Sequence, residues 1–107
     1  MRFEIVLAPD ARKAFRGLPA RLRALVRDAL ETHLSHAPTK LSKSRIKQLR
    51  GMRQPQYRLR VGDLRVFYDV RNETVEVLAI VTKAQGQAWL DEEGTPDADG
   101  GTGEGEG

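Results

Sequence analysis

Cysteine is absent from the 107-residue sequence, which excludes disulfides, cysteine-bound metal centres and a thiol nucleophile. Long apolar runs are absent as well. The longest, Val77 to Val81, has five residues, whereas a membrane-spanning helix needs about 20. The first residues lack the apolar core of a signal peptide, so we expect a cytoplasmic protein that contacts no membrane.

Metal-ligand patterns are also scarce. The two histidines, His33 and His36, lie three residues apart with no third ligand nearby in the sequence, and the carboxylates of residues 1–90 show no metal-binding spacing. We therefore expect no metal and no cofactor, and we assign the histidines a capping or surface role. The length fits one small domain.

Charge is distributed unevenly along the chain. Residues 91–107 hold seven of the 15 acidic residues, six of the ten glycines and no Lys or Arg. Residues 1–90 therefore carry 18 basic and eight acidic residues, a formal net charge of +10. We predict a basic domain over residues 1–90, followed by an acidic, glycine-rich, disordered tail over residues 91–107. A basic domain favours a polyanionic partner, and a merely solvated basic surface is the alternative.

The first third of the chain has helical periodicity after one short strand. Residues 3–7 form the predicted strand, and Pro9 suits the first turn of a helix that ends near Gly17. A longer helix with an apolar stripe follows and ends before Pro38. Because the link between the two helices is short, they should form a helical hairpin.

The rest of the domain has the period of strands. Residues 38–56 are basic and irregular, with a short edge strand expected over 49–51. Apolar alternation then predicts strands over 57–61, 64–70 and 75–82, before a last helical turn over 84–90. The predicted fold class is α+β: a β-α-α-β-β-β order, with an antiparallel-rich sheet packed on an N-terminal helical hairpin.

Gly62-Asp63 has the sequence of a two-residue hairpin turn, and this turn fixes the pairing of the flanking strands. Arg60 then faces Arg65, and Arg58 faces Phe67. One face of the hairpin is apolar and must be buried against the helices: Tyr57, Leu59, Val61, Leu64, Val66 and Tyr68. The other face carries Arg58, Arg60, Arg65 and Phe67.

The second face has the chemistry of an RNA-binding surface. Two arginines directly opposite each other on a sheet repel, by up to about 1 kcal/mol. Guanidinium groups bind phosphates with paired donors, and an aromatic ring can stack on a base. Arginine stems that only cover the sheet are the alternative interpretation. Lys83, at the end of the last strand, is the candidate general base because arginine stays protonated.

Three segments carry a family resemblance: KQLRG at residues 47–51, YRLRVGDLRVFYDV at residues 57–70, and VLAI at residues 77–80. With the order of elements from Phe3 to about Leu90, they resemble the RelE/ParE superfamily of toxins from type II toxin–antitoxin modules. The resemblance implies a compact toxin whose RelE-like members cut messenger RNA in the ribosomal A site and are silenced by an antitoxin that wraps around them.

The resemblance also assigns roles to residues. By position, Arg58 and Arg60 match the basic pair on the family's third strand, and Arg65 matches the arginine that stabilises the phosphate. Lys83 falls where members commonly carry an arginine. A tyrosine that acts as acid or base near the C-terminus of the best-known members is absent here, where Gln87 and Trp89 stand nearest. The residues expected to bind RNA are Lys43, Arg45, Lys47, Arg50, Arg53, Phe67 and Trp89.

Three functions remain open at this point. The first is a ribosome-dependent, metal-free mRNA endoribonuclease, with the ribosome, mRNA and a cognate antitoxin as partners. The second is a ParE-like inhibitor of DNA gyrase. The third is a degenerate toxin that only binds its antitoxin or the ribosome. The acidic tail either folds back onto the basic surface or increases solubility.

Overall fold

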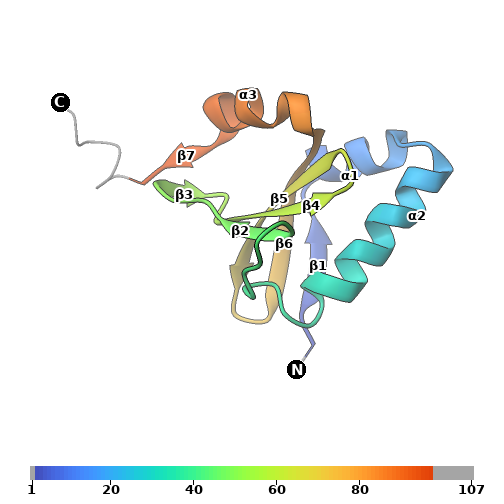
Figure 1. Ribbon diagram of the computed structural model, residues 1–107, viewed down its shortest axis with the longest axis horizontal. Coiled ribbons are helices and arrows are strands. Elements are labelled where there is room, and N and C mark those ends of the chain that lie inside the picture. The colour runs from blue at the N-terminus through green and yellow to red at the C-terminus, as the bar shows by residue number, and fades with distance from the viewer. Residues whose placement is uncertain (1, 98–107) are drawn as a thin grey trace.

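A five-stranded sheet forms the centre of the computed structural model, which describes residues 2–97 (Figure 1). Its strand order is β1-β6-β5-β4-β2. The strands are β1 (Glu4–Leu7), β2 (Ile46–Gln48), β4 (Tyr57–Val61), β5 (Leu64–Arg71) and β6 (Thr74–Thr82). Strand β1 is parallel to β6, and every other pair in this sheet is antiparallel. The expected α+β class with an antiparallel-rich sheet is confirmed.

Two helices cover one face of this sheet (Figure 1). Helix α1 (Pro9–Gly17) begins with Pro9 in its first turn, as its fixed φ angle allows, and ends before Pro19. Helix α2 (Ala20–Ala29) continues through a π-helical turn, η1 (Leu30–Leu34). No helix within residues 2–97 is long and apolar enough to cross a membrane.

The segment after β6 is more ordered than the sequence indicates. Helix α3 runs over Lys83–Glu93, and Thr82 and Gln85 form a capping box at its start. Strand β7 (Thr95–Pro96) then pairs with β3 (Met52–Gln54) in a second, two-stranded sheet. Residues 91–93, expected in the disordered tail, therefore belong to a helix, whose surface tolerates exposed acidic side chains, and residues 95–96 belong to a strand. Residues 98–107 of that expected tail lie outside the described residues.

The linker before β4 also differs from the expectation. The edge strand predicted over 49–51 is instead a turn, with Gly51 at a φ of +77°, and β2 and β3 lie on either side of it. A positive φ is accessible to glycine without a steric penalty. The linker thus connects the main sheet to the small sheet, in which β3 pairs with β7 just after the end of α3.

The core lies between the main sheet and the helices α1 and α2. Tyr68 and Leu59, on the predicted apolar face of the hairpin, are fully buried, as is Val26 of α2. The Tyr68 hydroxyl donates a hydrogen bond to the Pro38 carbonyl oxygen at 2.6 Å. Burial, and then the nearby Tyr57, raise the pKa of Tyr68 above its ordinary value, so this phenol stays protonated and acts as a structural donor.

We predict that Tyr68→Phe lowers the free energy of unfolding by about 1–2 kcal/mol, because the buried carbonyl oxygen of Pro38 loses its donor. Urea denaturation measures the change. Tyr57→Phe is the matched control: the Tyr57 ring stacks on Tyr68 with centroids 5.5 Å apart, and no hydrogen bond of its hydroxyl occurs within residues 2–97. Equal effects of the two substitutions would contradict the assignment.

Candidate functional site

The hairpin of β4 and β5 has the register that its sequence predicts. Arg58 pairs with Phe67, Arg60 with Arg65, and Val61 with Leu64 across the turn. Gly62 has a φ of +58°, as the first central residue of this turn requires. Since side chains alternate along a strand, Arg58, Arg60 and Arg65 share the face that points away from α1 and α2.

Strand β2 adds a fourth cation to this face, because Lys47 lies opposite Arg58. We call the surface formed by Lys47, Arg58, Arg60 and Arg65 the cationic face. Within residues 2–97 none of these four residues forms an ion pair. Within residues 2–97, no ion pair therefore neutralises the positive charge of the cationic face. An anionic ligand on this face would lie close to several hydrogen-bond donors.

Arg58 is the most suggestive member of the cationic face. Its side chain is half-buried, and its Nε atom is buried and has no hydrogen-bond partner among residues 2–97. Burial lowers the pKa of the Arg58 guanidinium, and the charges of Arg65 and then Arg60 lower it further. A buried donor without a partner costs free energy, which a bound phosphate oxygen would recover. The sequence identified this residue but not its unpaired nitrogen.

Arg65 is less available than the sequence suggests. Only 8% of the residue is exposed, and one guanidinium nitrogen donates hydrogen bonds to the carbonyl oxygens of Gly62 at 3.0 Å and Leu64 at 2.9 Å. These bonds hold the guanidinium at the turn of the hairpin. A ligand can therefore use only its remaining nitrogens, in an orientation that the backbone sets.

Phe67 does not present an open ring to solvent. It is 2% exposed, and the Trp89 ring of α3 stacks on it with centroids 5.1 Å apart and planes 10° apart. Phe67 was expected to stack on a base, and in this structure its ring is already covered. Trp89 is half-buried, so the aromatic surface available beside the cationic face belongs to Trp89.

The remaining predicted residues divide into two groups. Lys83 is exposed at the start of α3, and its backbone N–H donates to the Asp63 oxygen at 2.8 Å, so it lies near the hairpin turn. Arg45 lies beside Arg60, whose N–H donates to the Arg45 oxygen at 2.8 Å. The other group is exposed on the linker or the small sheet: Lys43, Arg50 and Arg53.

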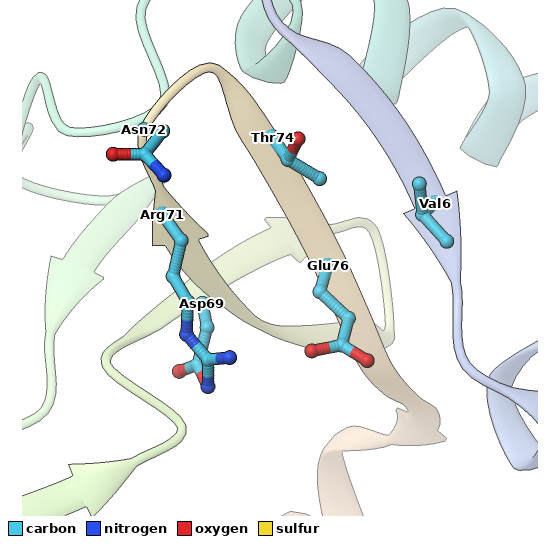
Figure 2. A pocket seen from close by; sticks show the side chains of 6 residues that line it. All are labelled: Val6, Asp69, Arg71, Asn72, Thr74 and Glu76. Atoms are coloured by element: carbon cyan, nitrogen blue, oxygen red, sulfur yellow. The ribbon is translucent and has the colours of Figure 1, made fainter.

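The other end of the same sheet face carries an acidic hollow that the sequence did not reveal (Figure 2). A cavity of about 310 Å³ is lined by Asp69, Arg71 and Glu76, with Val6, Asn72 and Thr74 around it. Asp69 is buried, and its carboxylate accepts hydrogen bonds from the Gln54 side chain at 2.7 Å and the Gln56 N–H at 2.8 Å. These bonds fix the backbone just before Arg58.

No cluster of three metal-ligating side chains occurs in residues 2–97. The protein is a small α+β fold whose main sheet has a cationic face, and helix α3 partly covers this face of the sheet. Comparison with known proteins agrees with this class. Residues 5–86 match the family model described as "ParE toxin of type II toxin-antitoxin system, parDE", and the chain belongs to this family of toxins.

Solved structures of similar fold come from toxin–antitoxin systems. The RelBE2 toxin–antitoxin complex of Mycobacterium tuberculosis contains a chain that aligns with a TM-score of 0.62 at 24% identity, over 77% of this chain and 99% of that one. A chain of the archaeal RelE–RelB complex from Pyrococcus horikoshii OT3 aligns with a TM-score of 0.60 at 25% identity, over 79% and 99%. The YoeB dimer from Staphylococcus aureus follows with a TM-score of 0.58 at 13% identity, over 76% and 97%. No curated protein sequence matches the chain significantly.

The packing of α3 on Phe67 and on Met52 of β3 predicts opposite effects for two glycine substitutions. In Gly86→Ala the new Cβ would lie 3.7 Å from Phe67 Cζ, an ordinary contact, so we expect the helix to gain about 0.5–1 kcal/mol from the better propensity of alanine. Thermal unfolding, followed by Trp89 fluorescence, measures the change.

Gly94→Ala is the contrasting variant. Its Cβ would lie 2.5 Å from Met52 Cε and 2.6 Å from the Leu90 carbonyl oxygen, so the end of α3 must move and stability should fall by about 1–3 kcal/mol. A destabilised Gly86→Ala protein would contradict the observed placement of α3 over Phe67.

Proposed function

We propose that this toxin is a ribosome-dependent mRNA endoribonuclease that inhibits translation. The observation that carries the proposal is the cationic face, where three arginines have no acidic partner within residues 2–97 and the buried Nε of Arg58 has no hydrogen-bond partner among those residues. Single-stranded RNA offers the phosphates that such donors bind. The family resemblance supplies the ribosomal A site as the place of action.

The proposed reaction uses the RNA's own 2′-hydroxyl as the nucleophile, and it needs no metal. The 2′-oxygen attacks the adjacent phosphorus, the bond to the 5′-oxygen of the next nucleotide breaks, and a 2′,3′-cyclic phosphate forms. Arg58 and Arg60 would hold the non-bridging oxygens, and the free nitrogens of Arg65 would stabilise the additional negative charge of the transition state. Lys83 is the proposed proton acceptor, and the leaving oxygen takes a proton from Lys83 or from water.

An antitoxin is the proposed protein partner. Two structures of similar fold are complexes of RelE with RelB. The basic body of this chain, with a formal net charge of +10 over residues 1–90, would attract an acidic partner segment by electrostatic complementarity.

Inhibition of DNA gyrase is the second candidate function. The family model that matches residues 5–86 is the ParE model. The C-terminal helix offers no tyrosine for proton transfer, and the backbone already binds part of Arg65. Inhibition of gyrase needs neither a tyrosine for proton transfer nor a fully free Arg65 guanidinium, so this function is compatible with the same cationic face.

We expect new 5′ ends within the A-site codon of a reporter mRNA when the chain is added to a reconstituted translation reaction, and no cleavage of the naked RNA. Primer extension locates the ends. Arg58→Ala should reduce the cleavage rate by about 100-fold or more, because a positioned donor to the phosphate is lost. Arg16→Ala, which removes an exposed charge from α1, should leave the rate unchanged.

Each alternative gives a distinct result in the same material. An intact message, together with inhibition of the supercoiling activity of purified gyrase, would support the second candidate function. Intact message and unaffected gyrase would identify a toxin that only binds its antitoxin or the ribosome. Equal cleavage by wild type and Arg58→Ala, with both folded, would refute the assigned role of the cationic face.

A further inference from the structure

A groove continues the positive charge of the cationic face around the edge of the sheet. Strand β2 pairs with residues 57–59 of β4, and the Arg60 N–H donates to the Arg45 oxygen, which leaves a sheet edge beyond Arg60 near the hairpin turn. A groove of about 290 Å³ lies between this edge and the helical segment of α2 and η1. Its polar lining consists of Asp28, Thr32, His33, Arg45 and Arg60.

The charge of the groove is positive at neutral pH. Arg45 and Arg60 are exposed, are held side by side by the hydrogen bond between their backbones, and form no ion pair within residues 2–97. Asp28 is the one carboxylate in the lining. Burial, and then the charge of Arg45, lower the pKa of His33, so its imidazole is neutral and supplies a hydrogen-bond donor without adding charge.

Arg60 belongs to the groove and to the cationic face at once. It lies two residues from Arg58 on the same face of β4, and its charge lowers the pKa of Arg58. Arg45 acts on His33 in the same way at the other end of the groove. Arg58, Arg60 and Arg45 therefore form a path of cations from the sheet face to the groove beside η1, and Asp28 is the carboxylate in the lining of that groove.

We propose that this groove is a second phosphate-binding subsite, in which Arg45 and Arg60 bind the backbone of the RNA strand beyond the nucleotides on the cationic face. The inference rests on the proposed RNA function for the identity of the polyanion. We favour a flexible phosphodiester strand over an acidic peptide for two reasons. Every residue of the path is positively charged, and Leu25 is the sole large apolar side chain exposed in the lining of the groove.

The test compares binding of two uridine oligomers, a tetranucleotide and a dodecanucleotide, to wild type, Arg45→Gln and the control Arg16→Gln. We expect Arg45→Gln to weaken the dodecanucleotide about fivefold and to reduce its salt slope by about 0.7, the value for one lost contact with a single strand. We expect the tetranucleotide to occupy only the cationic face and therefore to bind both variants equally. Arg16→Gln should change neither affinity.

The His33 ring provides a second readout by NMR titration. The dodecanucleotide should raise the pKa of His33, because a phosphate near Arg45 offsets the charge that lowers it, and the tetranucleotide should not. Arg60 and Asp28 are the other charged groups facing the groove, and both are present in all three proteins.

The outcomes separate the inference from the function on which it rests. If wild type binds both oligomers and Arg45→Gln has no effect, or the same effect at both lengths, the subsite is refuted and the proposed function stands. If wild type binds neither oligomer, the proposed function fails as well. If Arg45→Gln weakens binding of a dodeca-glutamate peptide as much as binding of the RNA, the groove does not select a phosphodiester strand, and the inference is overturned.

Discussion

The pairing of β4 with β5 through the turn at Gly62-Asp63 governs both the core and the candidate site. It directs Leu59 and Tyr68 into the interior and sets Arg60 opposite Arg65 on the other face. A slip of one residue would exchange the two faces, burying guanidiniums and exposing the apolar side chains. The repulsion costs up to about 1 kcal/mol, whereas each large apolar side chain buried contributes about 1.5–3 kcal/mol. The free energy gained by burying the apolar face therefore exceeds the cost of placing arginines opposite each other on the other face.

The surroundings of this face restrict what its cations can do. Carbonyl oxygens of the hairpin hold part of Arg65, and the buried Asp69 carboxylate fixes the chain just before Arg58. Helix α3 covers Phe67 with Trp89. Rigid backbone partners keep the guanidiniums in a defined arrangement, as phosphate recognition requires. The same contacts remove Phe67 from direct contact with a base, so any stacking would use the outer face of Trp89.

The predictable part of this protein is the part governed by local rules. Period-two alternation and the turn at Gly62-Asp63 were enough to predict the hairpin register and the residues on each face, including Arg58 and Arg60. The length of α3 and its pairing through β7 were not predictable, because acidic residues 91–93 have the composition of a tail and the strand contact is between distant segments. The covering of Phe67 by Trp89 follows from that long-range packing, and the hydrogen bonds of Asp69 depend on the Gln54 side chain and the Gln56 N–H, which reach the carboxylate only in the fold.

We propose that the cationic face, and Arg58 above all, contacts the phosphate of the codon in the proposed mRNA cleavage. A structure of the chain on a ribosome whose A-site codon carries 2′-O-methyl groups tests this most directly, because the blocked nucleophile would trap the complex before cleavage. We expect the scissile phosphate to lie within hydrogen-bond distance of the Arg58 and Arg60 guanidiniums, with Trp89 facing the RNA. A bound toxin that turns α1 and α2 toward the codon, with the cationic face away from the message, would contradict it.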